Sequence, residues 1–344
     1  MHIAITADPE LPVPPRLYGG IERVIAMLAA EFIARGHEVS LFAHPDSTAA
    51  ATLFPWPGAS SHSRADTIRN ALFLWREVRH MNIDVLHSFS RIAYLLPLLG
   101  HPVPKLMSYQ RPITRSTVKL GHALSRGSLE FSAISQWMMK PVADIGLWHL
   151  VPNGVALSLF PFVEDPGREA PLMFLGRVEE IKGPHLAIEI AQRTCLPLVI
   201  AGNVPSEHQA WFDDNIAPHL NDRIRYVGPV DDARKAELLG NARALLMPIL
   251  WDEPFGIVMA EALACGTPVL GFRRGSVPEV VEHGVSGLVV DDLDQMVAAV
   301  DHLAGIDRRD CRARIQACYS QTAVAEAYLG LYRQLLDRRD AGVR

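Results

Sequence analysis

Two glutamates flank a segment whose backbone could bind a negatively charged or hydroxyl-rich ligand. Seven residues separate Glu253 from Glu261. Because Pro254 disfavours helical angles in the residue before it, we expect Glu253 on a loop and Glu261 in the helix that follows. The first N–H groups of that helix lack partners within it and lie at the positive end of its dipole; they belong to Phe255, Gly256 and Ile257. The alternative to a ligand site is that Glu253 only neutralises the positive end of the helix and that Glu261 is a solvated helix residue.

A second cluster of charged residues precedes another expected helix. Arg177 follows an apolar run, and Lys182 stands just before Pro184, a residue type tolerated at the first position of a helix. A cation at the positive end of a helix dipole is unfavourable unless an anion is also there. We therefore favour a bound phosphate, to which Arg177 offers a planar fork and Lys182 a point charge. The alternative is a surface ion pair between Lys182 and Glu179 or Glu180.

A third candidate lies near the N-terminus. Four prolines between positions 9 and 15 precede Tyr18, Gly19 and Gly20. A stiff segment that delivers two glycines to a helix start allows the backbone to approach a phosphate or a sugar closely. The glycine pair alone is equally typical of a turn.

Short apolar strands alternate with helical patterns along the chain and must position these residues. In the first half we expect strands at 3–7, 38–43, 84–88, 105–110, 131–134 and 149–152. In the second half we expect them at 172–175, 197–201, 224–227, 244–247, 269–272 and 288–290. Such alternation predicts an α/β fold with mostly parallel sheets covered on both faces.

A stretch rich in proline and glycine divides the pattern and predicts two domains. We expect a first domain at 1–158, a linker at 159–171 and a second domain at 172–321. The tail, 322–341, carries apolar residues at helical spacing and should form an amphipathic helix. Two doubly wound domains that present the carboxyl ends of their strands would place a ligand crevice between them.

With these motifs the chain resembles the family 4 retaining glycosyltransferases, which have the two-domain GT-B fold, with Rossmann-like domains facing each other across a cleft. The resemblance covers nearly the whole chain, and the paired glutamates are its most specific motif. The other matching motifs are Gly19-Gly20-Ile21-Glu22-Arg23, Ala133-Ile134-Ser135, Pro152-Asn153-Gly154-Val155, Gly176-Arg177 to Lys182-Gly183, and Val227-Gly228.

The resemblance implies a hexosyltransferase that moves a sugar from a UDP- or GDP-sugar to an acceptor hydroxyl, with retention and without a metal or other cofactor. Arg177 and Lys182 would bind the diphosphate. Glu253, with the backbone at 255–257, would hold the sugar, and Glu261 the ribose. Val227 and Gly228 would lie by the base, Gly19 and Gly20 would approach the donor, and the tail helix would pack back on the first domain. The product would belong to glycan, glycolipid or glycosylated-metabolite synthesis.

One residue departs from the pattern of similar enzymes, which usually carry a sugar-contacting histidine where this chain has Gln110. An amide donates and accepts hydrogen bonds but carries no charge near neutral pH. Two other readings therefore stay open: a GT-B-type epimerase or phosphorylase, and a nucleotide-sugar-binding protein without turnover. His87 matches a histidine that is often found in such enzymes, although a core role is the simpler interpretation.

The stretch 101–129 contains basic residues and no carboxylates, and could attract an anionic acceptor or an anionic membrane surface. Its lysines and arginines are Lys105, Arg111, Arg115, Lys119 and Arg126. An ordinary solvated face explains them equally well. The N-terminus has no Lys or Arg ahead of an apolar run, so we expect a cytoplasmic protein, with peripheral membrane contact as an option.

Composition and missing motifs exclude several other classes. The net charge is −5, which argues against a protein dedicated to binding nucleic acid, and four cysteines without a Cys-x-x-Cys pair indicate neither a disulfide framework nor a zinc site. The sequence contains no P-loop, dinucleotide-binding or serine-hydrolase motif. Asp292-Leu293-Asp294 matches a metal-binding Asp-x-Asp formally, but turn and capping roles explain it better.

Overall fold

The computed structural model describes residues 1–15 and 19–342, which form two compact units. The first unit consists of Met1–Asn153 and Gln321–Arg344, and the second of Gly154–Ser320. Tyr18, which precedes the glycine pair, lies outside the described residues.

The first unit contains a parallel sheet of seven strands in the order β3-β2-β1-β4-β5-β6-β7. The strands are β1 (His2–Thr6), β2 (Glu38–Ala43), β3 (Thr52–Pro55), β4 (Val85–Ser88), β5 (Lys105–Tyr109), β6 (Leu129–Ala133) and β7 (Trp148–Leu150). The helices of this unit are α1 (Gly20–Ala34), α2 (Arg64–His80), α3 (Arg115–Ser125), α4 (Gln136–Met139) and α12 (Gln321–Asp340). A core that includes Phe42, Trp56 and Phe131 joins sheet and helices.

The second unit contains a parallel sheet of six strands in the order β10-β9-β8-β11-β12-β13. The strands are β8 (Leu172–Leu175), β9 (Leu198–Ala201), β10 (Ile224–Tyr226), β11 (Ala244–Met247), β12 (Val269–Phe272) and β13 (Gly287–Val290). The helices are α5 (Pro184–Thr194), α6 (Gln209–Asn215), α7 (Asp232–Gly240), α8 (Ile257–Ala264), α9 (Val277–Val280), α10 (Leu293–Ala299) and α11 (Arg308–Cys318). A second core forms around Phe174, Ile200 and Leu246.

Both sheets reverse their strand order beside their first strand. β1 lies between β2 and β4, and β8 lies between β9 and β11. In open parallel sheets, ligands bind outside the carboxyl ends of the strands at such a reversal. The loops after β1 and β4, and those after β8 and β11, are therefore the positions at which to look for sites.

The domain boundary differs from the sequence-based expectation. The division falls between Asn153 and Gly154, so the expected linker at 159–171 belongs to the second unit. Its proline and glycine content indicated an exposed connection, but Phe160 is 3% exposed and Val163 N donates to Cys265 O (3.0 Å). These contacts attach the segment to the second unit. The final helix, α12, belongs to the first unit.

Candidate active site

Lys182 and Glu253 meet in the second unit from two loops that leave adjacent strands. Lys182 ends a single 3-10 turn (Glu180–Lys182) after β8, and Glu253 lies on the loop between β11 and α8. The Lys182 Nζ to Glu253 Oε2 distance is 2.7 Å, and both side chains are mostly buried, at 17% and 12% exposed. The alternative interpretation, a surface pair of Lys182 with Glu179 or Glu180, is not found among the described residues, since Lys182 pairs with Glu253. The anion that the helix dipole requires is supplied by Glu253, so the dipole argument alone does not call for a phosphate.

Trp251 completes this cluster, and sequence reasoning gave it no role. Its Nε1 donates to Glu253 Oε2 (3.1 Å), and the Lys182 ammonium lies 4.4 Å from the centroid of its ring. The indole therefore fixes the carboxylate and contacts the cation at the same time. Its position two residues before Glu253 is the signal that was available in the sequence.

Arg177 projects from the end of β8 and keeps much of its guanidinium accessible. Its Nη2 lies 2.8 Å from Glu179 Oε1, and its side chain is 38% exposed. Glu179 is buried and also lies 3.4 Å from His208 Nε2. Glu179 therefore orients Arg177, and the rest of the planar fork stays open to a ligand.

Close backbone contacts lock the two loops together. Gly183 has φ +74°, and a Cβ there would lie 2.0 Å from the carbonyl oxygen of Pro248. Leu250 N also donates to Ile181 O (2.8 Å) across the same pair of loops. Only glycine fits at position 183, because any side chain would separate the loops that carry Lys182 and Glu253.

The loop after β12 holds Glu253 from the other side. Gly275 has φ +52°, and a Cβ there would lie 2.4 Å from both the backbone N and the O of Glu253. Ser276 N donates to Glu253 O (2.9 Å). The backbone of Glu253 is therefore fixed by a third loop, which the spacing of the two glutamates could not indicate.

Glu253 lies on a loop before α8, as expected, but the helix begins at Ile257, so Phe255 precedes the N-cap and does not lie in the first turn. Phe255 is 3% exposed, Gly256 adopts φ +69° at the N-cap, and Ile257 begins the helix. No side chain caps this helix start, so the orientation of its first N–H groups depends on the backbone alone. Free N–H groups at a helix start are donors for an anion or a hydroxyl.

Glu261 lies within α8 and is buried, at 3% exposed, so it is not a solvated helix residue. Its Oε1 contacts Lys235 Nζ of α7 (2.5 Å), which also lies 3.2 Å from Asp232 Oδ1. Lys235 was missed from sequence because it precedes Glu261 by 26 positions with no motif between them. The pair fixes the orientation of Glu261 at low solvent exposure.

Val227 and Gly228 follow β10 and lie beside the loop that follows β9. Gly202 N donates to Gly228 O (2.9 Å), and Tyr226 Oη donates to Gly202 O (2.8 Å). Val227 is 37% exposed. The chain thus presents a small apolar surface at the carboxyl edge of the sheet.

In the first unit, the glycine pair opens α1. Gly19 is the N-cap of this helix and Gly20 its first residue. A Cβ at Gly19 would lie 2.7 Å from Pro15 Cβ and 2.8 Å from Glu22 Oε2, whereas a Cβ at Gly20 would meet nothing within 4 Å. Among the described residues, nothing fills the space beside Gly20. Burial raises the pKa of Glu22.

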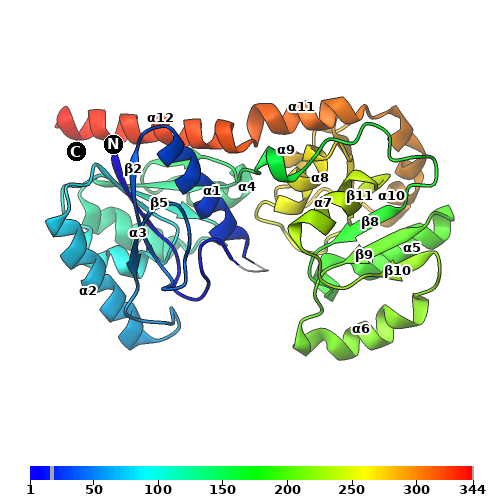
Figure 1. Cartoon of the computed structure of the whole chain (residues 1–344), viewed down its shortest axis with the longest axis horizontal. Coiled ribbons are helices and arrows are strands. Elements are labelled where there is room, and N and C mark those ends of the chain that lie inside the picture. The colour runs from blue at the N-terminus through cyan, green and yellow to red at the C-terminus, as the bar shows by residue number, and fades with distance from the viewer. Residues whose placement is uncertain (16–18, 343–344) are drawn as a thin grey trace. The chain divides into compact units, whose positions relative to one another are not determined.

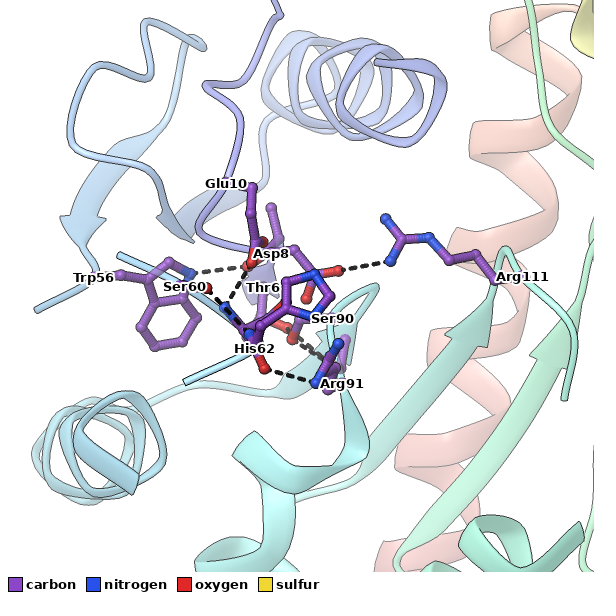
Figure 2. A network of polar contacts seen from close by, with 12 residues as sticks. Thr6, Asp8, Glu10, Trp56, Ser60, His62, Ser90, Arg91 and Arg111 are labelled. Carbon is purple, nitrogen blue, oxygen red and sulfur yellow. Dashed lines mark hydrogen bonds and ion pairs between the residues drawn. The ribbon is translucent and has the colours of Figure 1, made fainter. Parts of the chain in front are cut away.

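A polar network lies at the carboxyl ends of β1, β4 and β5 (Figure 2). Asp8 follows β1, is 8% exposed, and its Oδ2 lies 3.5 Å from Arg111 Nη1. Burial raises the pKa of Asp8, and the Arg111 charge opposes this shift. The nearby Arg91 and Glu10 are bonded to the backbone of Ser61, through its carbonyl (2.6 Å) and its N–H (2.5 Å) respectively. Sequence reasoning gave Asp8 no role, and Arg111 was considered only as part of a basic stretch.

Several buried polar atoms have no hydrogen-bond partner among residues 1–15 and 19–342. In this region they include Asp8 Oδ1 and the amide Nε2 of Gln110, which follows β5. Buried polar atoms are normally bonded, so such atoms at the edge of a sheet point to a ligand. Gln110 therefore has a donor without a partner among the described residues.

His87 occupies the core, as its flanking apolar residues indicated. It is fully buried, with Nδ1 bonded to Tyr332 Oη (2.5 Å) and Nε2 to Ser108 Oγ (2.6 Å). Burial lowers its pKa to about 3. The neutral imidazole makes two hydrogen bonds and thereby joins α12 to the sheet. It does not act as an acid at neutral pH.

The Asp-x-Asp sequence serves the capping role expected of it. Asp292 caps α10 by accepting from Gln295 N (2.8 Å), and Asp294 pairs with Arg193 (2.7 Å). Across the two described ranges, no three His, Cys, Asp or Glu side chains are grouped so that they could hold a metal ion.

The basic stretch does not form one continuous face. Lys105 is fully buried at the start of β5, so the expectation that it could contact a membrane or an anionic acceptor is wrong. Arg111 and Arg115 have carboxylate partners, Asp8 and Asp144. Within the part of the chain that the structure describes, no helix combines the length and the apolar character needed to cross a bilayer.

Comparisons with known proteins agree with this arrangement. Residues 18–159 match the family described as Glycosyltransferase Family 4, and residues 160–314 match Glycosyl transferases group 1. The phosphatidyl-myo-inositol mannosyltransferase of Mycolicibacterium smegmatis is 27% identical over 335 residues, which cover 87% of this chain and 84% of that protein.

Solved structures share the fold along the whole chain. A glycosyltransferase from Rickettsia africae aligns with a TM-score of 0.80 at 17% identity, covering 97% of this chain and 98% of its own. HepE from Anabaena, solved in complex with UDP and glucose, aligns with a TM-score of 0.73 at 16% identity, covering 97% and 100%. The two parallel sheets and these neighbours define a GT-B glycosyltransferase fold. The chain belongs to the family 4 glycosyltransferases, and it is a glycosyltransferase.

Proposed function

We propose that the chain is a retaining hexosyltransferase that moves a sugar from a UDP- or GDP-sugar to an acceptor hydroxyl. The observation that carries this proposal is the meeting of Lys182, Glu253 and Trp251 at the carboxyl ends of β8 and β11, where the strand order reverses. HepE, a neighbour of the same fold, was solved with UDP and glucose, which supports a nucleotide-sugar donor.

Lys182 and Arg177 bind the diphosphate in this proposal. The Lys182 ammonium has three donors, and Glu253 accepts one of them. The other two remain for phosphate oxygens, and the exposed fork of Arg177 supplies further donors. The N–H groups of Phe255 to Ile257 add the positive end of a helix dipole.

Glu253 positions the transferred sugar and is not a nucleophile. Its carboxylate is held by Lys182 and Trp251 and retains acceptor capacity for sugar hydroxyls. We assign the ribose to Glu261, the base to the surface at Val227 and Gly228, and a further sugar contact to the free amide donor of Gln110. Gly20, beside open space, is assigned to close approach by the donor.

The catalytic step depends on electrostatic stabilisation. Negative charge grows on the diphosphate as the bond to the sugar breaks, and preorganised donors stabilise that charge more than the ground state. The acceptor oxygen attacks the same face that the diphosphate leaves, and a diphosphate oxygen takes the hydroxyl proton. Lys182 and Arg177 supply the positive charge in this proposal, so no metal is required. Activity that is lost in EDTA and restored by manganese would overturn the metal-free part of it.

The acceptor is assigned to the polar network of the first unit. Asp8 Oδ1 is buried without a partner among the described residues, so a hydroxyl donated to it replaces a missing hydrogen bond. Asp8→Asn changes this acceptor atom with little change in volume. We expect it to raise the acceptor KM while donor affinity stays unchanged.

A thermal-shift panel of UDP, GDP, UDP-glucose and GDP-mannose tests the proposal. A ligand that binds only the folded state raises Tm by mass action. We expect one nucleotide and its sugars to raise Tm in the wild type and to do so much less in Lys182→Met. No shift with any of the four, or equal shifts in both proteins, would contradict it. Release of nucleotide only when an acceptor is present then separates a transferase from a binding protein.

A further inference from the structure

A hollow of about 440 Å³ lies in the first unit. It lies at the opposite ends of the strands from the polar network of Asp8. It is formed by the segments that lead into β5 and β6 and by the last turns of α12. Because the strands are parallel, these segments mark the amino ends of the strands. The hollow is therefore separate from the carboxyl-end loops to which the donor and the acceptor are assigned.

Three arginines and one glutamate are among the residues that line this hollow. The arginines are Arg126, Arg338 and Arg339, and the glutamate is Glu130. Arg338 Nη2 donates to Glu130 Oε2 (2.8 Å), and His149 Nε2 bonds the same oxygen (2.6 Å). The negative charge of Glu130 is thus already compensated from within the unit.

The remaining donors of these arginines are open. Arg338 Nε is buried without an acceptor within the described ranges, and the Arg126 guanidinium has neither an ion pair nor a hydrogen bond there. Arg339 pairs with Asp340 through its Nε (2.8 Å), which leaves its terminal nitrogens free of that bond. Planar forks with open donors match the oxygens of a phosphate.

A buried lysine behind the wall adds to this positive potential when it is protonated. Lys105 is 0% exposed, and its Nζ donates to the carbonyl oxygens of His101 (2.6 Å) and Val103 (2.8 Å). No described carboxylate forms an ion pair with it, and burial lowers its pKa to about 7. Since His101 itself lines the hollow, an anion bound there would lie close to Lys105 and would favour its charged form.

We propose that this hollow binds a phosphate ester of a polyhydroxylated molecule through Arg126, Arg338 and Arg339. The guanidinium groups hold the phosphate, and Glu130 accepts hydrogen bonds from hydroxyls. A free phosphate ion is much smaller than the hollow, so the rest of the volume accommodates the polyol. Two sources carry this chemistry: a soluble sugar phosphate and the headgroup of an anionic phospholipid.

Arg126 gives a variant that removes the charge without harming the backbone. It adopts a left-handed conformation, with φ 51° and ψ 37°, at the C-cap of α3. Glycine favours that conformation, so Arg126→Gly is expected to fold and to keep its Tm or raise it. Lys119→Ala is the matched control, because Lys119 is an exposed cation of the same helix that does not line the hollow.

The test is calorimetric titration of the full chain with glucose 6-phosphate, alongside sedimentation with vesicles of phosphatidylglycerol and phosphatidylcholine. We expect wild type, Lys119→Ala and Lys182→Met to bind equally, and Arg126→Gly to bind about tenfold more weakly, as for loss of one charge-assisted contact. Binding of glucose 6-phosphate identifies a soluble source. Sedimentation alone, lost in Arg126→Gly but kept in Lys119→Ala, identifies a lipid headgroup.

Three results with the wild type, Arg126→Gly and Lys119→Ala would overturn the proposal, and a fourth result is given by Lys182→Met. The first three are binding of neither probe by the wild type, equal binding by Arg126→Gly and wild type, and equal losses in Arg126→Gly and Lys119→Ala. Loss of glucose 6-phosphate binding in Lys182→Met alone would place the phosphate in the second unit and would also count against this hollow. The donor site is judged separately by its own response to UDP or GDP, so either proposal can fail while the other stands.

Discussion

At the scale of single residues, a substitution at Lys182 should affect mainly donor binding, and a substitution at Glu253 should affect mainly turnover. Replacing Lys182 by Met removes the charge proposed to hold the diphosphate, so we expect donor affinity to fall by roughly tenfold or more. Glu253→Gln keeps the size of the side chain and changes how the sugar is held, so kcat should fall by about a hundredfold with nucleotide affinity largely intact. Calorimetry with UDP or GDP and initial-rate kinetics measure the two effects. The reverse pattern would reject these roles.

His87 provides a residue-scale prediction about stability. Its pKa is lowered to about 3 in the folded chain, whereas an unfolded histidine titrates near 6.5. The unfolded state therefore binds more protons between these values, and the free energy of unfolding falls as pH drops through this window, by up to about 1.4 kcal/mol per unit. In His87→Gln this contribution is absent. Urea titrations at about pH 7 and pH 5 should therefore show a smaller decrease in the free energy of unfolding than in the wild type. Equal pH slopes would refute a buried neutral imidazole.

At the scale of elements, two loops depend on glycine for their mutual approach. Gly183→Ala would place a methyl group against the carbonyl of Pro248, and Gly284→Ala, at φ +82°, meets nothing within 4 Å. Gly284→Ala should therefore cost only the left-handed strain, about 1 kcal/mol, and Gly183→Ala clearly more. Urea unfolding compares the two, and Gly183→Ala should also weaken nucleotide binding. Equal costs would show that the loops are not tightly locked.

The strands were predictable from sequence because each combines an apolar run with turn signals. The strands at 38–43, 172–175, 244–247 and 269–272 have the predicted bounds. Strand β3 was missed because Thr52–Pro55 is a half-exposed edge strand that ends in proline, without a buried apolar pattern. The boundary at Asn153 was missed because Phe160 packs against the second unit in spite of the prolines around it.

The site was predictable only in part, because side chains meet through long-range contacts. The sequence indicates that three charged residues of the site lie in loops after strands: Arg177, Lys182 and Glu253. The partner of Lys182 lies 71 positions away, and nothing local indicates that it is Glu253 instead of Glu179. The roles of Trp251 and Lys235 likewise depend on the strand order of the sheet, which brings the loops after β8 and β11 together.

At the scale of the whole molecule, the first unit is built from both ends of the chain. Helix α12 packs on α1 (Figure 1). Its Tyr328 and Tyr332 are almost fully buried beside His87. The first unit therefore cannot complete its core until the end of the chain is present. The second unit is continuous in sequence, and it carries the residues assigned to the diphosphate, the ribose and the base.

The crystal structure of the full chain with UDP or GDP, whichever raises Tm, tests the central claim most directly. We predict that the diphosphate lies at the carboxyl ends of β8 and β11, within hydrogen-bond distance of Arg177, Lys182 and the N–H groups that begin α8. Glu261 should contact the ribose hydroxyls. A nucleotide bound elsewhere would contradict the assignment. So would a diphosphate at the ends of β8 and β11 if Lys182 bonded only to Glu253 and not to the diphosphate.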